Sequence, residues 1–124
     1  MVDLLLVVVP QVREIERLVL RHARALAVPH LLDVEVSQVL RRLVRHRTIS
    51  TEAALDALGG LRDLPLQRYP HLTLLGRVFE MRASITAYDG VYLALAEGLA
   101  ADLYTRDQRL ARAAGPRARV RVIR

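Results

Sequence analysis

The stretch Asp102–Ala114, DLYTRDQRLARAA, decides the fold class of this chain. We expect a short strand over Asp102–Thr105 and a helix over Asp107–Ala114, because Gly115 and Pro116 follow as helix-ending residues. A strand that passes directly into a helix is half of a strand–helix–strand unit. Such units build parallel sheets, since the chain must cross back before it adds the next strand.

The rest of the chain alternates helical and extended patterns in the same way. Further helices are expected at Gln11–Val28, Leu31–His46, Ser50 or Thr51 to Gly59-Gly60, His71–Arg82 and Thr86–Glu97. Strands are expected at Leu64–Tyr69, which Pro65 restricts to an edge of the sheet, and at Val120–Ile123. The Val2–Val9 run fits either a strand or the tail of a buried helix. The pattern predicts a small α/β domain with a largely parallel central sheet.

The basic residues of this 124-residue chain are all arginine, 19 against 13 acidic residues, and cysteine is absent. The lack of lysine excludes a P-loop, a Schiff-base enzyme and a response-regulator receiver. The lack of cysteine excludes thiol nucleophiles, disulfides and cysteine-type zinc sites. The histidines lack the spacing of a zinc protease, and the glycines never form a dinucleotide-binding GxGxxG. Carboxylates, hydroxyls and arginines remain, and the net charge of +6 favours polyanionic or acidic partners.

The length of the chain fits a single domain over residues 1–124. The longest apolar run, Leu4–Val9, is far shorter than a membrane span. Asp3 stands where a secretory signal would carry basic residues, and no small-residue cleavage site follows. We therefore expect a cytoplasmic protein without membrane contact.

Glu35 is the first of three carboxylates in unusual places. Within the expected helix its neighbours four residues away are Leu31 and Val39, so the carboxylate borders the apolar stripe and not the arginine face. A buried carboxylate is costly unless it is paired or bound to a metal. The structural explanation is an edge position with an arginine partner, and the functional one is a metal-binding acid.

Asp89 and Asp107 lie where the chain enters a helix. Asp89 stands three residues after Thr86, and Asp107 begins the helix that follows the Asp102–Thr105 strand, so helix capping explains each acid taken alone. In doubly wound sheets, however, sites form at the carboxyl ends of strands. Acids that converge there repel one another unless a cation neutralises them, and all-oxygen ligands select Mg²⁺ or Mn²⁺.

Three segments that carry these acids resemble the PIN-domain ribonucleases, in particular the VapC-type toxins of toxin–antitoxin pairs. The segments are AVPHLLDVEVSQVLRRL (27–43), TAYDGVYLALAEGL (86–99) and DLYTRDQRLARAA (102–114). In that family a Pro-x-x-x-x-x-Glu helix, a Tyr-Asp-(Ala/Gly)-x-Tyr-x-Ala-Leu-Ala helix and a Leu-x-Thr-x-Asp turn each supply one acid. These acids match Glu35, Asp89 and Asp107, with Thr105 as the hydroxyl beside the site. The motifs occur in family order over nearly the whole chain.

The resemblance implies a three-layer PIN-like domain and an endoribonuclease that hydrolyses RNA phosphodiester bonds through Mg²⁺ or Mn²⁺. Asp89, Glu35 and Asp107 would hold the metal, with Asp89 in direct contact. Three arginines beside the last acid would track the RNA backbone, or else form an ordinary solvated helix face: Arg106, Arg109 and Arg112. Tyr88 and Tyr92 would either stack on a base or, as amphipathic spacing favours, belong to the core.

The beginning of the chain departs from the family pattern. PIN domains open with an apolar strand that ends in a metal-binding Asp and a small or hydroxyl residue. Met1–Leu6 matches a later, helical stretch of the family better, so we expect Asp3 to be a helix residue and the first strand with its Asp to be missing. The competing interpretation makes Val2 the strand and Asp3 the catalytic acid, although two residues are short for a strand.

The missing Asp leaves a second function open. The chain would then be a catalytically impaired PIN-like binding module that dimerises and holds an antitoxin. For either function the resemblance implies a homodimer and a VapB-like antitoxin that wraps the toxin and plugs the acidic site with an arginine.

Overall fold

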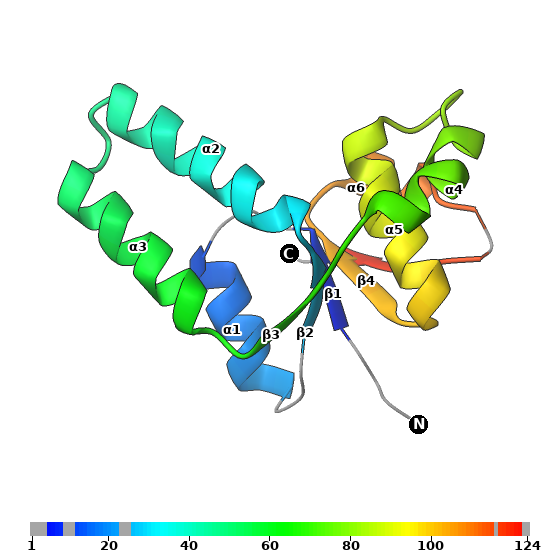
Figure 1. Cartoon of the computed structure of the whole chain (residues 1–124), viewed down its shortest axis with the longest axis horizontal. Coiled ribbons are helices and arrows are strands. Elements are labelled where there is room, and N and C mark those ends of the chain that lie inside the picture. The colour runs from blue at the N-terminus through cyan, green and yellow to red at the C-terminus, as the bar shows by residue number, and fades with distance from the viewer. Residues whose placement is uncertain (1–4, 9–11, 23–25, 116, 123–124) are drawn as a thin grey trace.

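In the computed structural model the chain folds around a five-stranded sheet in the order β3-β2-β1-β4-β5 (Figure 1). The structure describes residues 5–8, 12–22, 26–115 and 117–122. The strands are β1 Leu5–Val8, β2 Leu26–Pro29, β3 Leu66–Tyr69, β4 Asp102–Thr105 and β5 Arg119–Val122. The helices are α1 Val12–His22, α2 Leu31–Arg45, α3 Thr51–Asp63, η1 Leu72–Leu74, α4 Leu75–Glu80, α5 Ala87–Leu99 and α6 Gln108–Ala113. All four strand pairs are parallel, which confirms the predicted α/β fold with parallel strands.

The order of the strands reverses between β1 and β4. The chain first builds outward from β1 to β2 and β3, then returns across the sheet to add β4 and β5 on the other side. Because crossovers between parallel strands are right-handed, the helices of the two halves belong on opposite faces of the sheet, as a three-layer domain requires. Helix α5 packs on β1, β2 and β4, across this point of reversal.

The expectation that the first strand is missing is wrong for the described residues. Leu5–Val8 form β1 at the centre of the sheet, where Leu5 pairs with Leu26 of β2 and with Asp102 of β4. Leu5 and Leu6 are thus strand residues and not the helix residues expected from Met1–Leu6. A continuous apolar, β-branched run suits a central parallel strand that is covered on both faces. Asp3 and Val2 lie outside the described residues.

A second correction concerns Gln11–Val28, for which the sequence predicted one helix. Helix α1 ends at His22, and Leu26–Pro29 form strand β2 instead. The side chains of Leu26, Ala27 and Val28 are 0% exposed, and β2 pairs with β1 on one side and β3 on the other. A run of four apolar residues is too short to show either the helical or the strand period of hydrophobic residues. Pairing with the neighbouring strands therefore determines that this segment is a strand.

Helix α3 also differs from its prediction, because Gly59-Gly60 do not end it. The helix starts at the Ser50 cap, whose Oγ accepts a hydrogen bond from the Ala53 N–H at 3.0 Å, and continues to Asp63. Its C-cap is Leu64, the residue before Pro65, and a residue before proline is driven out of the helical region. Proline, rather than glycine, therefore sets the end of this helix.

The other elements follow the sequence closely. Helix α2, strand β4 and the α5 start at Thr86 agree with prediction to within one residue, and β3 is an edge strand as expected. The predicted His71–Arg82 helix is divided into the 3₁₀ turn η1 and α4. No helix in the described part of the chain is long and apolar enough to cross a membrane.

Helices α2 and α3 form an antiparallel hairpin that extends from the sheet, with the turn between them at its far end (Figure 1). Arg68 of β3 clamps the base of this hairpin. Its guanidinium donates to both carboxylate oxygens of Asp33 on α2, at 2.8 and 3.1 Å, and to the Leu61 carbonyl of α3 at 3.3 Å. A bidentate arginine–carboxylate pair fixes orientation as well as distance. The hairpin is therefore tied to the edge of the sheet.

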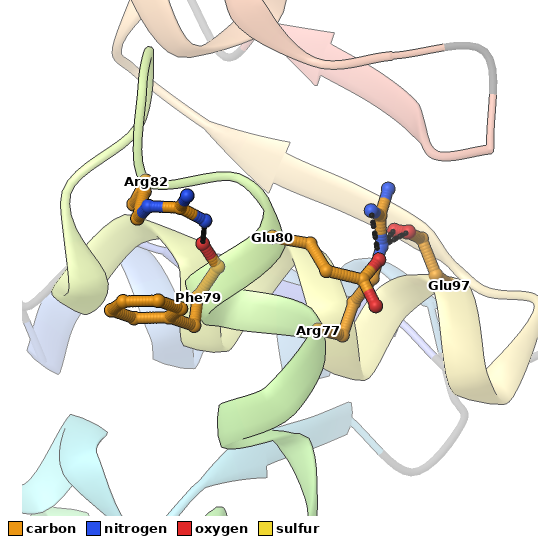
Figure 2. A network of polar contacts seen from close by, with 5 residues as sticks. All are labelled: Arg77, Phe79, Glu80, Arg82 and Glu97. Atoms are coloured by element: carbon orange, nitrogen blue, oxygen red, sulfur yellow. Dashed lines mark hydrogen bonds and ion pairs between the residues drawn. The ribbon is translucent and has the colours of Figure 1, made fainter.

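Helix α4 packs closely on α5 through a small residue and an ion-pair network. A Cβ at Gly90 would lie 2.9 Å from Val78 Cγ1, so glycine permits the close approach. Arg77 Nε donates to the Glu97 carboxylate of α5 at 2.9 and 3.2 Å (Figure 2). Beside it the Arg82 guanidinium lies 4.5 Å from the centre of the Phe79 ring.

Candidate functional site

The predicted acids come together at the carboxyl end of the sheet, beside the point where the strand order reverses. Asp107 follows β4, Glu35 lies in the second turn of α2 after β2, and Asp89 lies in the first turn of α5. Crevices at such reversal points are the usual ligand sites of open α/β sheets. The fold therefore places all three carboxylates where a site is expected.

Asp89 and Asp107 border the same hollow, which has a volume of about 260 Å³. The residues that line it come from the start of α5, the segment before it and α6: Ser84, Ile85, Thr86, Asp89, Asp107, Arg109, Leu110 and Ala113. The two carboxylates thus share one solvent-filled space, with the Arg109 guanidinium at its margin. Arg109 Nε lies 3.5 Å from Asp107 Oδ1.

Asp107 is held by the backbone around it. Its Oδ1 accepts hydrogen bonds from the N–H groups of Arg109 at 2.9 Å and Leu110 at 3.4 Å, which makes it the N-cap of α6. The Asp107 N–H in turn donates to the Thr105 hydroxyl at 3.0 Å, and Thr105 is only 1% exposed. The capping interpretation is thus confirmed, and Thr105 serves as a buried support of the Asp107 backbone.

Asp89 is also joined to a helix cap. The side chain of Thr86 caps α5 by accepting a hydrogen bond from the Asp89 N–H at 3.2 Å. Capping and a position on the hollow occur together in both aspartates, so the structural role does not compete with a chemical one.

Glu35 differs from its structural expectation, because its hydrogen-bond partner is a tyrosine and not an arginine. The Tyr92 hydroxyl of α5 donates to Glu35 Oε1 at 2.5 Å. Tyr92 is 1% exposed and belongs to the core, as expected, whereas Tyr88 is 63% exposed and does not. The sequence contained the Glu35 signal but not its partner, since Glu35 and Tyr92 lie far apart in the sequence and meet only in the folded chain.

Two of the carboxyls, Glu35 and Asp89, have a raised pKa. Burial raises the pKa of Glu35 and the charge of Asp89 adds to this, while the Tyr92 hydrogen bond opposes it. Burial and the charge of Asp107 raise the pKa of Asp89, against the Thr86 hydrogen bond and Arg109. The charge of Asp89 thus acts on Glu35 and the charge of Asp107 acts on Asp89, so the three acids form one electrostatic cluster. Half-buried carboxyls of raised pKa that lie close to one another are a mark of functional sites.

The donor chemistry of this cluster fits a hard divalent cation, because all its ligand atoms are oxygens and their repulsion favours added positive charge. Among the residues that the structure describes, no group of three acidic or histidine side chains lies close enough together to hold a metal ion. Asp89 and Asp107, which face the same hollow, are the residues that fit a cation best.

Comparison with known proteins places the chain in a family. VapC ribonuclease Mb0985 of Mycobacterium bovis is 43% identical over 88 residues, which cover 71% of this chain and 69% of that protein. Ribonuclease VapC1 of Mycobacterium tuberculosis is 43% identical over 97 residues, which cover 77% of this chain and 73% of that protein. The chain belongs to the VapC ribonuclease family. No family model matches this VapC chain.

Two solved structures share the fold of this VapC-family chain. PAE2754 from Pyrobaculum aerophilum has a TM-score of 0.71 at 24% identity, over 97% of this chain and 92% of its own. VapBC2 from Rickettsia felis, solved bound to a DNA fragment from their promoter, has a TM-score of 0.66 at 12% identity, over 96% and 98%. At these identities the likeness concerns the fold alone.

Of the three arginines predicted to track RNA, one lies beside the acids. Arg109 borders the hollow, and the side chains of Arg106 and Arg112 are exposed. The sequence after β1, Val9-Pro10-Gln11, contains no acid at the place where the family resemblance expects one. The other candidate for that acid, Asp3, lies outside the described residues.

Proposed function

We propose that this VapC-family chain is a metal-dependent endoribonuclease of a toxin–antitoxin pair. The observation that carries the proposal is the coupled cluster of Glu35, Asp89 and Asp107 at the strand reversal, in a chain with a net charge of +6. An acidic centre with Arg109 beside it is suited to a substrate whose phosphates need both a cation and a basic side chain. The relatives named VapC ribonucleases support the same reaction class.

Each residue has a role that follows from its surroundings. Asp89, in the first turn of α5, and Asp107, the N-cap of α6, would hold Mg²⁺ or Mn²⁺. Glu35 would act on the cation or on a water bound to it. When bound, the cation would lower the pKa of a water and stabilise charge on the scissile phosphate. Thr105 positions Asp107 through the backbone, and Arg109 at the margin of the hollow would contact the RNA phosphates.

The test is cleavage of a folded RNA by the full chain with Mg²⁺, with Mn²⁺ and with EDTA. We expect cation-dependent cleavage that Asp89→Asn abolishes without loss of fold, checked by circular dichroism. Exposed Asp56 on α3, changed to Asn, is the matched control and keeps full activity. Cleavage that survives both EDTA and Asp89→Asn would contradict the proposal.

A second candidate is a binding module without catalysis, and the sequence Val9-Pro10-Gln11 after β1 favours it because no acid stands there. The same assay decides between the two, since Asp89→Asn changes nothing measurable in a pure binding module. Full activity of residues 1–124 that survives Asp3→Ala would show that no upstream acid is needed.

We further propose two protein partners. The first is a VapB-like antitoxin, which the relationship to VapC proteins supports. The second is another copy of the chain, supported by an exposed apolar stripe on η1 and α4: Leu72 is 77%, Leu75 42% and Phe79 66% exposed. Large side chains that share one exposed helix face are typical of interaction surfaces.

A further inference from the structure

The turn of the α2–α3 hairpin carries a dense group of arginines with no assigned role. We define the hairpin tip as Arg41, Arg42, Arg45, His46 and Arg47, all of which are exposed. From residue 41 to the start of α3 the sequence contains no acid, and the first one that follows is Glu52 inside α3. The hairpin places this charge at the end farthest from the sheet (Figure 1).

The tip arginines lack the acidic partners that several arginines elsewhere in the fold have. Arg68, Arg77 and Arg121 each form ion pairs with carboxylates at 2.7–2.9 Å. Within the described part of the chain, no carboxylate pairs with any arginine of the tip. Favourable interaction with the α2 dipole accounts for positive charge in the last turn of the helix. It does not account for Arg47, which lies beyond the helix end.

Arg47 occupies a backbone position that normally belongs to glycine. Its φ is +57°, in the left-handed region. The Thr48 N–H donates to the Leu43 carbonyl at 2.9 Å and the Arg47 N–H to the Val44 carbonyl at 3.0 Å, which is the Schellman arrangement of a helix end. A side chain at this position is strained, because its Cβ approaches the neighbouring carbonyl. An arginine retained there against the backbone preference points to a use for its charge.

We infer that the hairpin tip is a second RNA contact, which binds the phosphate backbone outside the acidic site; this rests on the proposed ribonuclease function. Glu35 and Arg45 of the tip lie on the same helix, ten residues apart. At 1.5 Å per residue this separation is roughly 15 Å along the helix. A strand of duplex RNA covers that span in about four to five nucleotides. The substrate is therefore an RNA of at least about five nucleotides that reaches both the acids and the tip, and a shorter fragment at the acids does not reach the tip.

The first test measures binding in the Asp89→Asn background without metal, so that cleavage and catalysis do not enter. The probe is an RNA stem-loop of about 20 nucleotides, titrated over a range of salt concentrations. In the tip variant Arg41, Arg42 and Arg47 are changed to Gln. We expect binding at least about tenfold weaker, and a slope of log K against log salt that is smaller by roughly two to three units.

The matched control removes the same charge from other exposed sites, by changing Arg13, Arg21 and Arg117 to Gln. We expect its salt slope to stay close to that of the parent. Equal affinities and slopes for the tip variant and this control would overturn the inference, as would a parent protein that binds no stem-loop. Failure of the nuclease proposal alone is distinguishable, because it shows as absent cleavage with binding and its tip dependence intact.

Two further experiments distinguish an RNA contact at the tip from a purely structural tip and from a protein contact. Arg47→Gly relieves backbone strain, so its melting temperature should stay equal or rise while stem-loop binding weakens; a purely structural tip would show no loss of binding. Polyglutamate serves as an acidic peptide probe. If the tip variant loses polyglutamate binding but keeps stem-loop binding, the tip is a protein contact and the inference is wrong.

Discussion

The Glu35 carboxylate accepts the Tyr92 hydroxyl yet remains half-buried next to the charge of Asp89. Its pKa in the folded chain lies above the ordinary 4.5, so the folded protein holds this proton more tightly than the unfolded chain does. The corresponding stability is present below about pH 4.5 and is lost as the pH rises through the raised pKa. At neutral pH the ionised, half-buried Glu35 carboxylate therefore destabilises the folded protein.

Glu35→Gln should therefore stabilise the protein near pH 7, because glutamine keeps the acceptor for Tyr92 without the buried charge. The gain in melting temperature is expected to fall towards zero near pH 4, where the wild-type carboxyl binds its proton. Thermal denaturation at both pH values checks this. Exposed Glu52→Gln is the control, and an equal gain for it at pH 7 would contradict the explanation.

Bound divalent cations should stabilise the wild-type protein more than a variant that lacks one of the cation-binding acids. If Asp89 and Asp107 hold Mn²⁺ in the native state, saturating Mn²⁺ raises the wild-type melting temperature, since a ligand that binds only the folded chain stabilises it. Asp89→Asn should show a clearly smaller rise, measured by the same thermal scans. An identical rise in both proteins would place the cation elsewhere.

The two roles of Asp107 can be separated by the choice of substitution. Asp107→Ala removes the acceptor for the Arg109 and Leu110 N–H groups and should cost about 0.5–2 kcal/mol of stability. Asp107→Asn keeps an acceptor and should retain nearly all of that stability, while it loses cleavage as fully as alanine does. Urea denaturation and the RNA assay measure the two effects. Full cleavage by the asparagine variant would leave Asp107 with its capping role alone.

At the scale of elements, Arg47 makes the end of α2 less stable than glycine would. Arg47→Gly should raise the free energy of unfolding by about 0.5–1 kcal/mol, because the strain of a side chain in the left-handed region exceeds the added freedom of glycine in the unfolded chain. Arg45→Gly, two residues earlier inside the helix, is the opposite control and should cost about 1 kcal/mol. If urea denaturation showed that both changes raise the free energy of unfolding, or that both lower it, the explanation by backbone strain at Arg47 would be wrong.

The elements that sequence alone predicted are those with a long helical period or a strong cap. Helix α2 has fifteen residues of amphipathic pattern, and α5 and α6 begin at the capping residues Thr86 and Asp107. Leu26–Pro29 and Leu5–Val8 lack such signals, because four apolar residues suit a strand or a helix equally. Both became strands through pairing with neighbours distant in sequence, which no local pattern contains.

The sequence predicted which acids belong to the candidate site, but not the contacts that these acids make. Each acid could be found from its unusual local position, and the carboxyl-end rule brought Asp107 and Asp89 together. The Tyr92 hydrogen bond to Glu35 and the place of Thr86 on the hollow could not be foreseen, because they depend on the angle at which α5 crosses the sheet. Spacing predicts which residues share a face, but not which side chains meet.

At the scale of the whole molecule, we expect the proposed dimer to form through the exposed stripe on η1 and α4. Leu72→Ser with Phe79→Ser should convert a dimer into a monomer, measured by light scattering after gel filtration, because burial of these side chains drives such contacts. Leu20→Ser on α1, which is 84% exposed, is the control and should leave the mass unchanged. A double variant that remains dimeric would place the interface elsewhere.

The position of β1 has a consequence for how the protein is made. Leu5 pairs with Asp102 and Val8 with Thr105, so the middle of the sheet joins segments that are far apart in the sequence. Contacts between residues so far apart in sequence form late, since a long loop must close before they contribute. During synthesis β1 leaves the ribosome well before β4, and its apolar residues lack this neighbour until β4 has been made. Because Asp107 follows β4 directly, the acidic cluster is assembled only after β4 has been synthesised.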